Sequence, residues 1–364
     1  MKIYLKKCLP AIVLSFLFSF FALTTLEAKV KIHSIKSPNG DLELQVVTDT
    51  NISFCLLHKD NVLVTSPALS MTLKDGTILG PNAQVRKARK TDSREIIASP
   101  LYRKSQIVDQ YQQLDVNFRG GFGIRFRVYD QGAAYQFYTV QKDSLCVVNE
   151  SAGFIFDRDH TCYVPYSRGE ENPFQNSFEN VYSVIPVSEF DREKLAFLPL
   201  LVCLENGMKM ALTESDMESY PGMYLRGGKT ANGFEFKGVF APIPSKTVTE
   251  PGRGQVLASE YSDILAKTSG TRSFPWRIMA VATEDTELPV NDLVYILGAP
   301  NRAGNTDWIK PGKVAWDWWN NWGITGVDFP AGINTETYKY YIDFASANGI
   351  EYVVLDEGWS PPAG

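Results

Sequence analysis

Two short apolar runs near the end of the sequence, within 313–320 and 352–359, each finish in tryptophans and carboxylates. An indole ring offers an apolar face on which a sugar ring can stack. Carboxylate and amide oxygens can bind sugar hydroxyls, and a carboxyl group can help to cleave an acetal. These residue types therefore predict a carbohydrate site. Its candidate substrate-binding residues are Trp316, Asp317, Trp318, Trp319, Asn320, Asp356 and Glu357.

The same residues also allow a structural interpretation. The tryptophans can instead pack the wall of a barrel, and Asp356 can form a salt bridge at its rim. Alternation along an extended strand sends Trp316 and Trp318 to one side and the residues that follow each of them to the other. Asp356 and Glu357 likewise face opposite sides, so they do not flank one bond as an acid and a nucleophile. We therefore expect Asp356 to bind substrate.

A helix is expected between the two runs. Asn334 is suited to cap a helix that begins at Thr335, and Gly349 is suited to end it. The apolar residues of this stretch recur at helical spacing, at Tyr338, Tyr341, Ile342 and Ala345. The run 350–355 is apolar apart from Glu351, as expected of a parallel strand buried on both faces. Strand, helix and strand predict a right-handed βαβ unit of a parallel barrel, whose active-site groups lie at the C-terminal ends of its strands.

Residues 29–285 are rich in short segments of alternating or β-branched residues, such as 42–47, 52–57, 123–129 and 134–140. Asn-Gly and Asp-Gly pairs, which favour tight hairpins, separate many of them. The pattern predicts a large β-sandwich of two broad sheets. Residues 286–312, with several prolines and glycines and a short helix at 291–297, are expected to form a linker. Residues 313–364 would then begin a second domain, so the expected fold class is mostly β plus α/β.

The N-terminal residues 1–28 have the features of a secretory signal peptide. Three lysines precede the apolar stretch 10–23, and Ala28 stands before an expected cleavage point. The stretch is short for a membrane span, so stable membrane insertion is not expected. An uncleaved anchor is the alternative. With a net charge of −5 and no basic stripe, the chain is also not expected to bind nucleic acid.

Few residues are arranged to bind a transition metal. Four cysteines follow residue 28, without a CxxC pair, and the three histidines are isolated from one another, which argues against zinc. The cysteines can be free buried thiols or can include one disulfide. Two acidic groups in the β-rich region offer the oxygen ligands that Ca²⁺ prefers, although each carboxylate taken singly is expected at the solvated surface. They are Glu170, Glu171 and Glu179, and Glu214, Asp216 and Glu218.

Long segments of the sequence resemble glycoside hydrolase family 97, which includes periplasmic α-glucosidases and α-galactosidases. The resemblance is carried by 307–320, 326–329, 332–345 and 355–359, and by the earlier stretch 213–225. It implies an N-terminal β-supersandwich followed by a (β/α)₈ TIM barrel, of which this chain holds only the beginning. It also implies a Ca²⁺ ion, with Glu179 as the best match to a ligand from the N-terminal domain. The catalytic acid/base and nucleophile are expected beyond residue 364.

From these features we predict an exported α-glycosidase, periplasmic or secreted, that hydrolyses terminal α-glucosidic or α-galactosidic bonds of an oligosaccharide with the help of Ca²⁺. The chain by itself is expected to bind sugar weakly and to turn over slowly or not at all. The alternative is a non-catalytic carbohydrate-binding protein in which the β-sandwich carries the function. Stereochemical outcome, preferred sugar and oligomeric state stay open.

Overall fold

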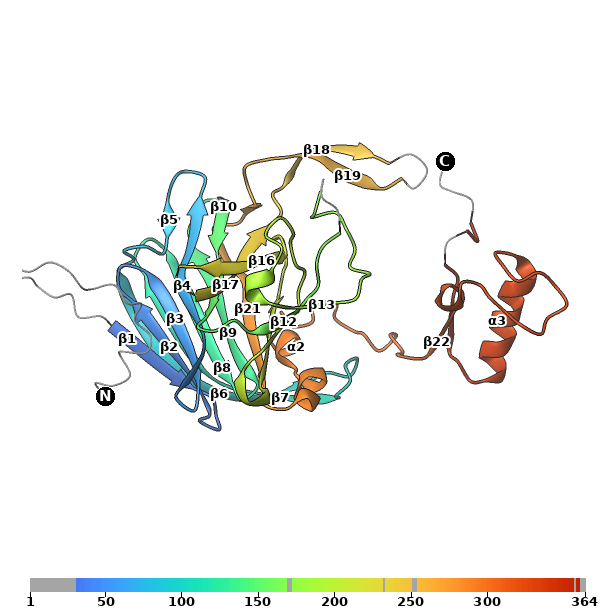
Figure 1. Ribbon diagram of the computed structural model, residues 1–364, viewed down its shortest axis with the longest axis horizontal. Helices are drawn as coiled ribbons and strands as arrows, with labels where there is room; N and C mark the ends of the chain where they lie inside the picture. Colours follow the sequence, from blue (N-terminus) through green and yellow to red (C-terminus); the bar gives the residue numbers. More distant parts are fainter. Residues whose placement is uncertain (1–30, 169–171, 232, 251–253, 357, 361–364) are drawn as a thin grey trace, which may run out of the picture. The chain divides into compact units, whose positions relative to one another are not determined.

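The computed structural model describes residues 31–168, 172–231, 233–250, 254–356 and 358–360 (Figure 1). The chain divides into two compact units. The first comprises residues up to Ile97, 107–246 and 260–299, and the second comprises 98–106, 247–259 and 300–364. The expected signal peptide lies outside the described residues. None of the helices described has both the length and the apolar character needed to cross a bilayer.

The first unit contains a ten-stranded sheet, counted over the described residues. Its main path runs through β1 (Lys31–Lys36), β2 (Leu42–Thr48), β3 (Ile52–His58), β4 (Asn61–Leu73), β11 (Gly153–Phe156), β17 (Gly233–Phe240) and β16 (Met223–Thr230). The strands β5 (Ile78–Leu79) and β10 (Leu145–Ser151) pair with β4, and β20 (Ala266–Thr268) pairs with β10. The pairs for which a register is given are antiparallel, as hairpin connections require.

A second sheet of nine described strands faces the first. Its order is β13 (Ser183–Pro186), β12 (Thr161–Val164), β14 (Leu200–Cys203), β15 (Lys209–Ser215), β21 (Thr271–Ala282), β9 (Gly132–Val140), β8 (Phe122–Tyr129), β7 (Gln106–Phe118) and β6 (Val85–Ala98). The turn between β14 and β15 is formed by Asn206 and Gly207, both with positive φ, as the Asn-Gly pair predicts. A separate two-stranded sheet joins β18 (Pro244–Thr249) and β19 (Val256–Tyr261).

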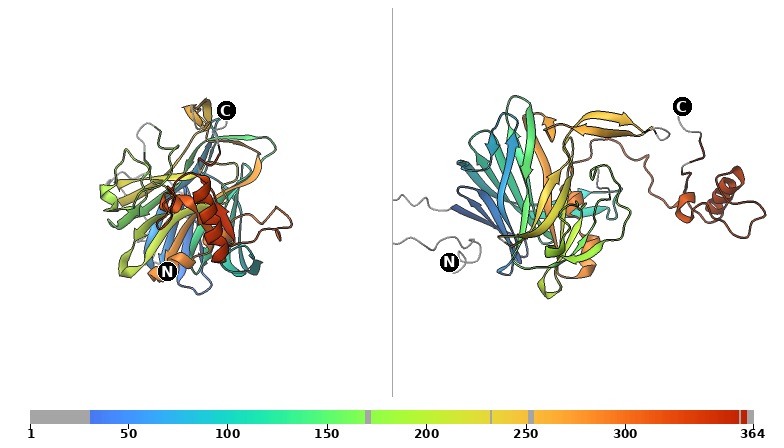
Figure 2. Two further views of the ribbon diagram at one scale, coloured as in Figure 1. Left: turned by 90° about the vertical axis from the view of Figure 1, so that its right-hand side faces the viewer. Right: turned by 45° about the horizontal axis from the view of Figure 1, so that its top comes forward.

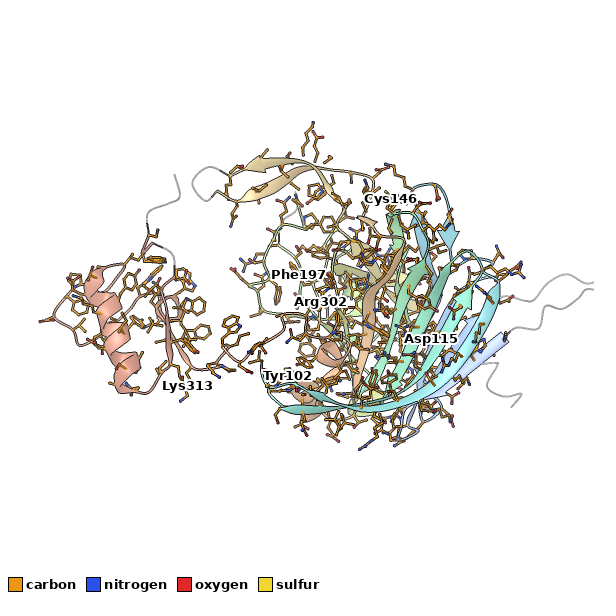
Figure 3. The ribbon with its side chains drawn as sticks, turned by 180° about the vertical axis from the view of Figure 1, so that it is seen from behind. Tyr102, Asp115, Cys146, Phe197, Arg302 and Lys313 are labelled. Carbon is orange, nitrogen blue, oxygen red and sulfur yellow. The ribbon has the colours of Figure 1, made fainter. Side chains whose placement is uncertain are left out.

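The core of the first unit lies between these sheets (Figure 2). Alternate residues of each strand point inward, so Leu44 and Val46 from one sheet join Phe126 and Val128 from the other in a single buried cluster. Side chains of both sheets fill the space between the layers (Figure 3). The predicted large β-sandwich is therefore confirmed. Single 3₁₀ turns, η1 (Val187–Glu189) and η2 (Glu205–Gly207), complete its loops.

The sandwich extends further along the chain than the sequence indicated. The turn η3 (Asp285–Val290) and the short helix α2 (Leu293–Ile296) belong to the first unit, which ends at Ala299. Leu293 and Ile296 are buried, and the Ser215 hydroxyl donates to the Val294 carbonyl at 2.6 Å. Proline and glycine correctly marked turns at 286–299, but burial of the apolar helix residues ties this part of the expected linker to the sandwich.

The second unit contains the predicted βαβ element. The strands β22 (Val314–Trp316) and β23 (Tyr352–Val354) pair in parallel, and α3 (Thr335–Ala347) connects them. The Asn334 side chain accepts a hydrogen bond from the Thr337 amide at 2.9 Å and caps the helix. Gly349, with a φ of +63°, follows its end as expected. The second strand is shorter than predicted and is not buried, because Tyr352 and Val354 are each more than two-fifths exposed.

None of the four cysteines among the described residues forms a disulfide. Cys146 and Cys162, the closest pair in sequence, lie in different sheets of the sandwich. Burial raises the pKa of the Cys162 thiol, which keeps it protonated and unreactive at neutral pH. Of the two alternatives that the sequence allowed, the described residues therefore show the one without a disulfide.

Candidate functional site

A hydrogen-bonded group of carboxylates and indoles lies where β22 and β23 end. Asp317 is fully buried, and its Oδ1 accepts the backbone N–H of Asp356 at 3.1 Å. Its Oδ2 accepts the indole N–H of Trp322, also at 3.1 Å. The indole N–H of Trp316 donates to Oδ2 of Asp356 at 2.6 Å. These hydrogen bonds hold the two strand ends together. We had expected Asp317 to contact substrate hydroxyls directly, but in the structure it positions Asp356 instead.

The tryptophans are not arranged by strand alternation, in contrast to the prediction. The strand ends at Trp316, and Asp317–Asn320 form the 3₁₀ turn η4. In such a turn residues three apart share a side, so Trp316 lies beside Trp319, with ring centroids 6.3 Å apart. The prediction continued the strand through Asp317–Asn320, but the backbone leaves the extended conformation directly after Trp316.

The turn is closed by two residues in the left-handed conformation, Asn321 and Trp322, with φ values of 54° and 52°. A bulky side chain rarely adopts this conformation, and strain of this kind is concentrated at functional sites. It brings the Trp322 ring back against Trp318, with centroids 4.8 Å apart. Asn320 donates to the Gly323 carbonyl and accepts from the Tyr341 hydroxyl, so α3 also holds the turn.

The indoles in this group remain accessible to a ligand. The side chain of Trp319 is 84% exposed, and those of Trp316 and Trp318 are more than one-third exposed. Exposed aromatic rings beside polar oxygens are what a sugar site requires. Glu357, the last of the predicted substrate-binding residues, lies outside the described residues.

One residue of this group was missed in the sequence as a functional candidate. Tyr338 was assigned only to the apolar side of the helix, but its hydroxyl is buried and has no hydrogen-bond partner among the described residues. Desolvation, followed by the nearby carboxylates of Asp317 and Asp356, raises the pKa of Tyr338. The one sequence signal for a functional role was its position in the first turn of α3, the helix that follows the first predicted strand.

Glu179, the predicted metal ligand, lies on a loop of the first unit. Its side chain is exposed and accepts a hydrogen bond from the Ser177 hydroxyl at 2.9 Å. Arg168 donates to the Glu179 carbonyl and to the Asn180 side chain, and the neighbouring Phe178 packs against Phe197. The loop therefore presents one carboxylate on a fixed backbone. Glu170 and Glu171 lie outside the described residues.

The donor chemistry at Glu179 suits Ca²⁺, but the number of donors does not complete a site. Ca²⁺ takes six to eight oxygen ligands in proteins. Within the described ranges, no three histidine, cysteine, aspartate or glutamate side chains gather closely enough to hold a metal ion. A calcium site that uses Glu179 therefore needs oxygens that these residues do not bring together.

A buried ion cluster in the first unit was also missed. Arg277 on β21 donates to both carboxylate oxygens of Glu150 on β10, at 2.8 and 2.7 Å. It also pairs with Glu214, which stands directly opposite it on β15. Burial raises the pKa of Glu214 although Arg277 opposes this effect. The Oε1 atom of Glu214 also accepts the backbone N–H of Met223 on β16 at 2.8 Å, so this interior carboxylate joins the two sheets. The expectation of a solvated carboxylate was wrong.

The family model of the glycosyl-hydrolase 97 N-terminal domain matches residues 35–300, and that of glycoside hydrolase 97 matches 318–363. A retaining α-galactosidase of Bacteroides thetaiotaomicron is 42% identical over 90% of this chain and 50% of its own length. A probable retaining α-galactosidase of Streptomyces bingchenggensis is 28% identical over 66% of this chain and 33% of its own length.

Solved structures agree on the fold. A glycoside hydrolase family 97 enzyme of a Pseudoalteromonas species, in complex with panose, superposes with a TM-score of 0.71 at 22% identity, over 90% of this chain and 48% of the other. A β-arabinopyranosidase superposes with a TM-score of 0.69 at 21% identity, over 88% of this chain and 50% of the other. The chain spans half or less of the length of these two curated relatives. Since the N-terminal family model alone matches more than half of the sequence, the chain belongs to glycoside hydrolase family 97.

Proposed function

We propose that the chain provides the sandwich and the first barrel unit of an exported retaining α-glycosidase. The observation that carries the proposal is the group of exposed indoles around a positioned carboxylate, Asp356, at the carboxyl ends of two parallel strands. The substrate class is a saccharide with a terminal α-galactosidic or α-glucosidic bond. The similarity to an α-galactosidase at 42% identity favours the galactoside.

The described residues have separate roles in this proposal. Trp319 offers its exposed face to the apolar side of a sugar ring. Asp356 binds sugar hydroxyls, and the bonds from Trp316 and to Asp317 fix its orientation before substrate arrives. Such preorganisation lowers the entropy cost of binding. None of the described residues is assigned as the acid/base or the nucleophile.

Ca²⁺ and export are part of the same proposal. We place Glu179 among the calcium ligands because its exposed carboxylate lies on a loop that Arg168 holds. In the whole enzyme to which this chain would contribute, chelation with EGTA is expected to lower α-glycosidase activity, and added Ca²⁺ but not Mg²⁺ is expected to restore it. The charged start and apolar stretch within residues 1–28 support export to the periplasm or the medium.

Titration with galactose, followed by tryptophan fluorescence, tests the site. Trp319→Ala is expected to weaken binding at least about fivefold, since loss of a stacked ring costs about 1 kcal/mol or more. Trp308→Ala removes an indole of similar exposure outside the strand end and is the matched control, with no loss expected. Equal effects of the two substitutions would contradict the site.

A second measurement separates the enzyme from the alternative function. The chain alone is expected to release p-nitrophenol from its α-galactoside slowly or not at all. Galactose binding that persists unchanged in both tryptophan variants would place the sugar on the sandwich and would favour a non-catalytic carbohydrate-binding protein.

A further inference from the structure

A cleft of about 500 Å³ in the first unit lies over β16 and β17, strands that are labelled in Figure 1. The sequence as a whole carries a net charge of −5, yet the charged side chains that line this cleft are mostly cationic. They are Arg192, Arg226, Lys229, Lys237 and Glu235. The cleft is therefore positively charged, whereas the chain as a whole is negatively charged.

The strand register places two of these cations face to face. Arg226 on β16 stands directly opposite Lys237 on β17. Like charges in this arrangement destabilise a sheet, whereas opposite charges would stabilise it. No ion pair joins Arg192, Arg226, Lys229 or Lys237 to a carboxylate within the part of the chain that the structure describes. The repulsion is thus left uncompensated by the protein itself.

The single acidic side chain of the cleft does not neutralise them. The Oε1 atom of Glu235 lies beside Gly153 on the neighbouring strand β11, where an added Cβ would approach it to 3.0 Å. The Glu235 carboxylate is thereby turned toward β11. Its one negative charge does not balance the four cations, so the cleft keeps a net positive charge.

Arg192 is fixed in place at this cleft. Its Nη2 donates to the Lys229 carbonyl at 2.6 Å, and its Nε lies where a Cβ at Gly228 would be only 2.8 Å away. The glycine makes room for the guanidinium above the strand. The other N–H groups of Arg192 have no partner among the described residues, so they remain available to a ligand.

The remaining lining defines the ligand further. Val148, Val239, Phe240 and Leu265 contribute an apolar surface beside the cations. Arginine and lysine together favour carboxylate, sulfate or phosphate groups, and the apolar surface favours a ligand with a nonpolar face. We infer that this cleft binds a small organic anion of that kind, as an acidic saccharide is. The inference does not depend on the proposed glycosidase function, because the cleft lies wholly in the first unit.

Calorimetric titration of the full chain with glucuronate, glucose and inorganic phosphate tests the inference. Glucuronate is expected to bind, glucose is expected not to bind at this cleft, and the affinity for glucuronate is expected to fall as salt is added. The double variant Arg226→Gln/Lys237→Gln is expected to weaken glucuronate binding at least about tenfold. Lys87→Gln/Arg89→Gln, which removes an exposed lysine and arginine from β6, is the matched control and is expected to bind normally.

Two further readouts keep the test independent of folding and of the barrel site. Without ligand, the melting temperature of Arg226→Gln/Lys237→Gln is expected to equal or exceed that of the parent chain, because a like-charge pair is removed. Trp319→Ala is expected to leave glucuronate binding unchanged. A lower melting temperature, undiminished binding in the double variant, equal binding of glucose, or binding of phosphate alone would each overturn the inference.

Discussion

The two units of this chain treat their apolar residues in opposite ways. In the sandwich, Leu44, Val64 and Phe126 are fully buried, and both sheets contribute to one continuous core. In the βαβ unit, Val314 and Val354 on the paired strands are each more than two-fifths exposed. Parallel strands normally have both faces covered. The sandwich is therefore stabilised by contacts within itself, while the described βαβ residues have strand geometry without the covering layers.

The helices and polar groups show the same contrast. Helix α3 buries Thr337 and Ala345, but Ile342 and Phe344 on it are half exposed. Some apolar residues of α3 therefore have no packing partner among the described residues that buries them. The sandwich, by contrast, can hold even three charged groups in its interior, because Arg277 pairs with Glu150 and Glu214. Local hydrogen bonds give the βαβ unit its form, and tertiary burial gives the sandwich its stability.

Replacement of Arg277 with methionine is expected to have the largest effect on stability. It leaves Glu150 and Glu214 buried without a counter-charge, which costs about 3–5 kcal/mol in free energy of unfolding. Urea denaturation of the full chain, followed by near-ultraviolet circular dichroism, measures the loss. The triple variant Arg277→Met/Glu150→Met/Glu214→Leu, which removes all the charges, is expected to recover most of it. A triple variant less stable than Arg277→Met would show that the ion cluster itself stabilises the sandwich.

A matched pair of phenylalanines tests the comparison most directly. Phe126→Ala opens a cavity in the sandwich core and is expected to cost about 3–5 kcal/mol. Phe344→Ala removes the same atoms from a half-exposed position on α3 and is expected to cost less than about 1 kcal/mol. Both values come from urea denaturation with signals specific to each unit. If Phe344→Ala were as costly as Phe126→Ala, the βαβ unit would have a core of its own and the contrast would fail.

The sequence predicted most reliably what local interactions decide. The start of α3 follows from one capping residue, Asn334, and the hairpin strands follow from alternation between Asn-Gly and Asp-Gly turns. The switch from strand to 3₁₀ turn after Trp316 was missed, because alternation carries no information on where an extended backbone ends. The end of the sandwich at Ala299 was missed since burial of α2 depends on a surface formed by strands distant in sequence.

The buried partners in the sandwich illustrate the same limit. Glu214 follows Met210 and Leu212 in the alternation of β15, which placed it on the inward side, and Arg277 stands within an apolar run. Both were signals of burial. Their pairing was not predictable, however, because sixty residues or more separate them in sequence and the register of β15 on β21 brings them together.

Asp317→Asn is expected to have an intermediate effect, confined to the βαβ unit. The amide retains the size of the side chain but offers one oxygen acceptor where the carboxylate offers two, so either the Asp356 amide or the Trp322 indole loses its partner. A buried donor left without a partner costs about 1–3 kcal/mol. Hydrogen exchange at Asp356 and the tryptophan emission maximum are expected to change, whereas protection of the sandwich amides is not. Changed protection in the sandwich would show that the two units are coupled in stability.

The smallest effect is expected from Asn334→Ala, which removes the cap of α3. The Thr337 amide then loses its acceptor, and loss of such a cap costs about 1 kcal/mol. The measurement is hydrogen exchange of the first-turn amides of α3, which are expected to exchange about fivefold faster. Lys339→Ala, at an exposed position of the same helix, is the control and is expected to leave these amides unchanged. Because the βαβ unit depends on local hydrogen bonds more than on burial, even this modest loss is expected to be visible there, whereas the same loss at a sandwich turn would be masked by the core. An unchanged exchange rate in Asn334→Ala would mean that packing, and not capping, sets the start of the helix.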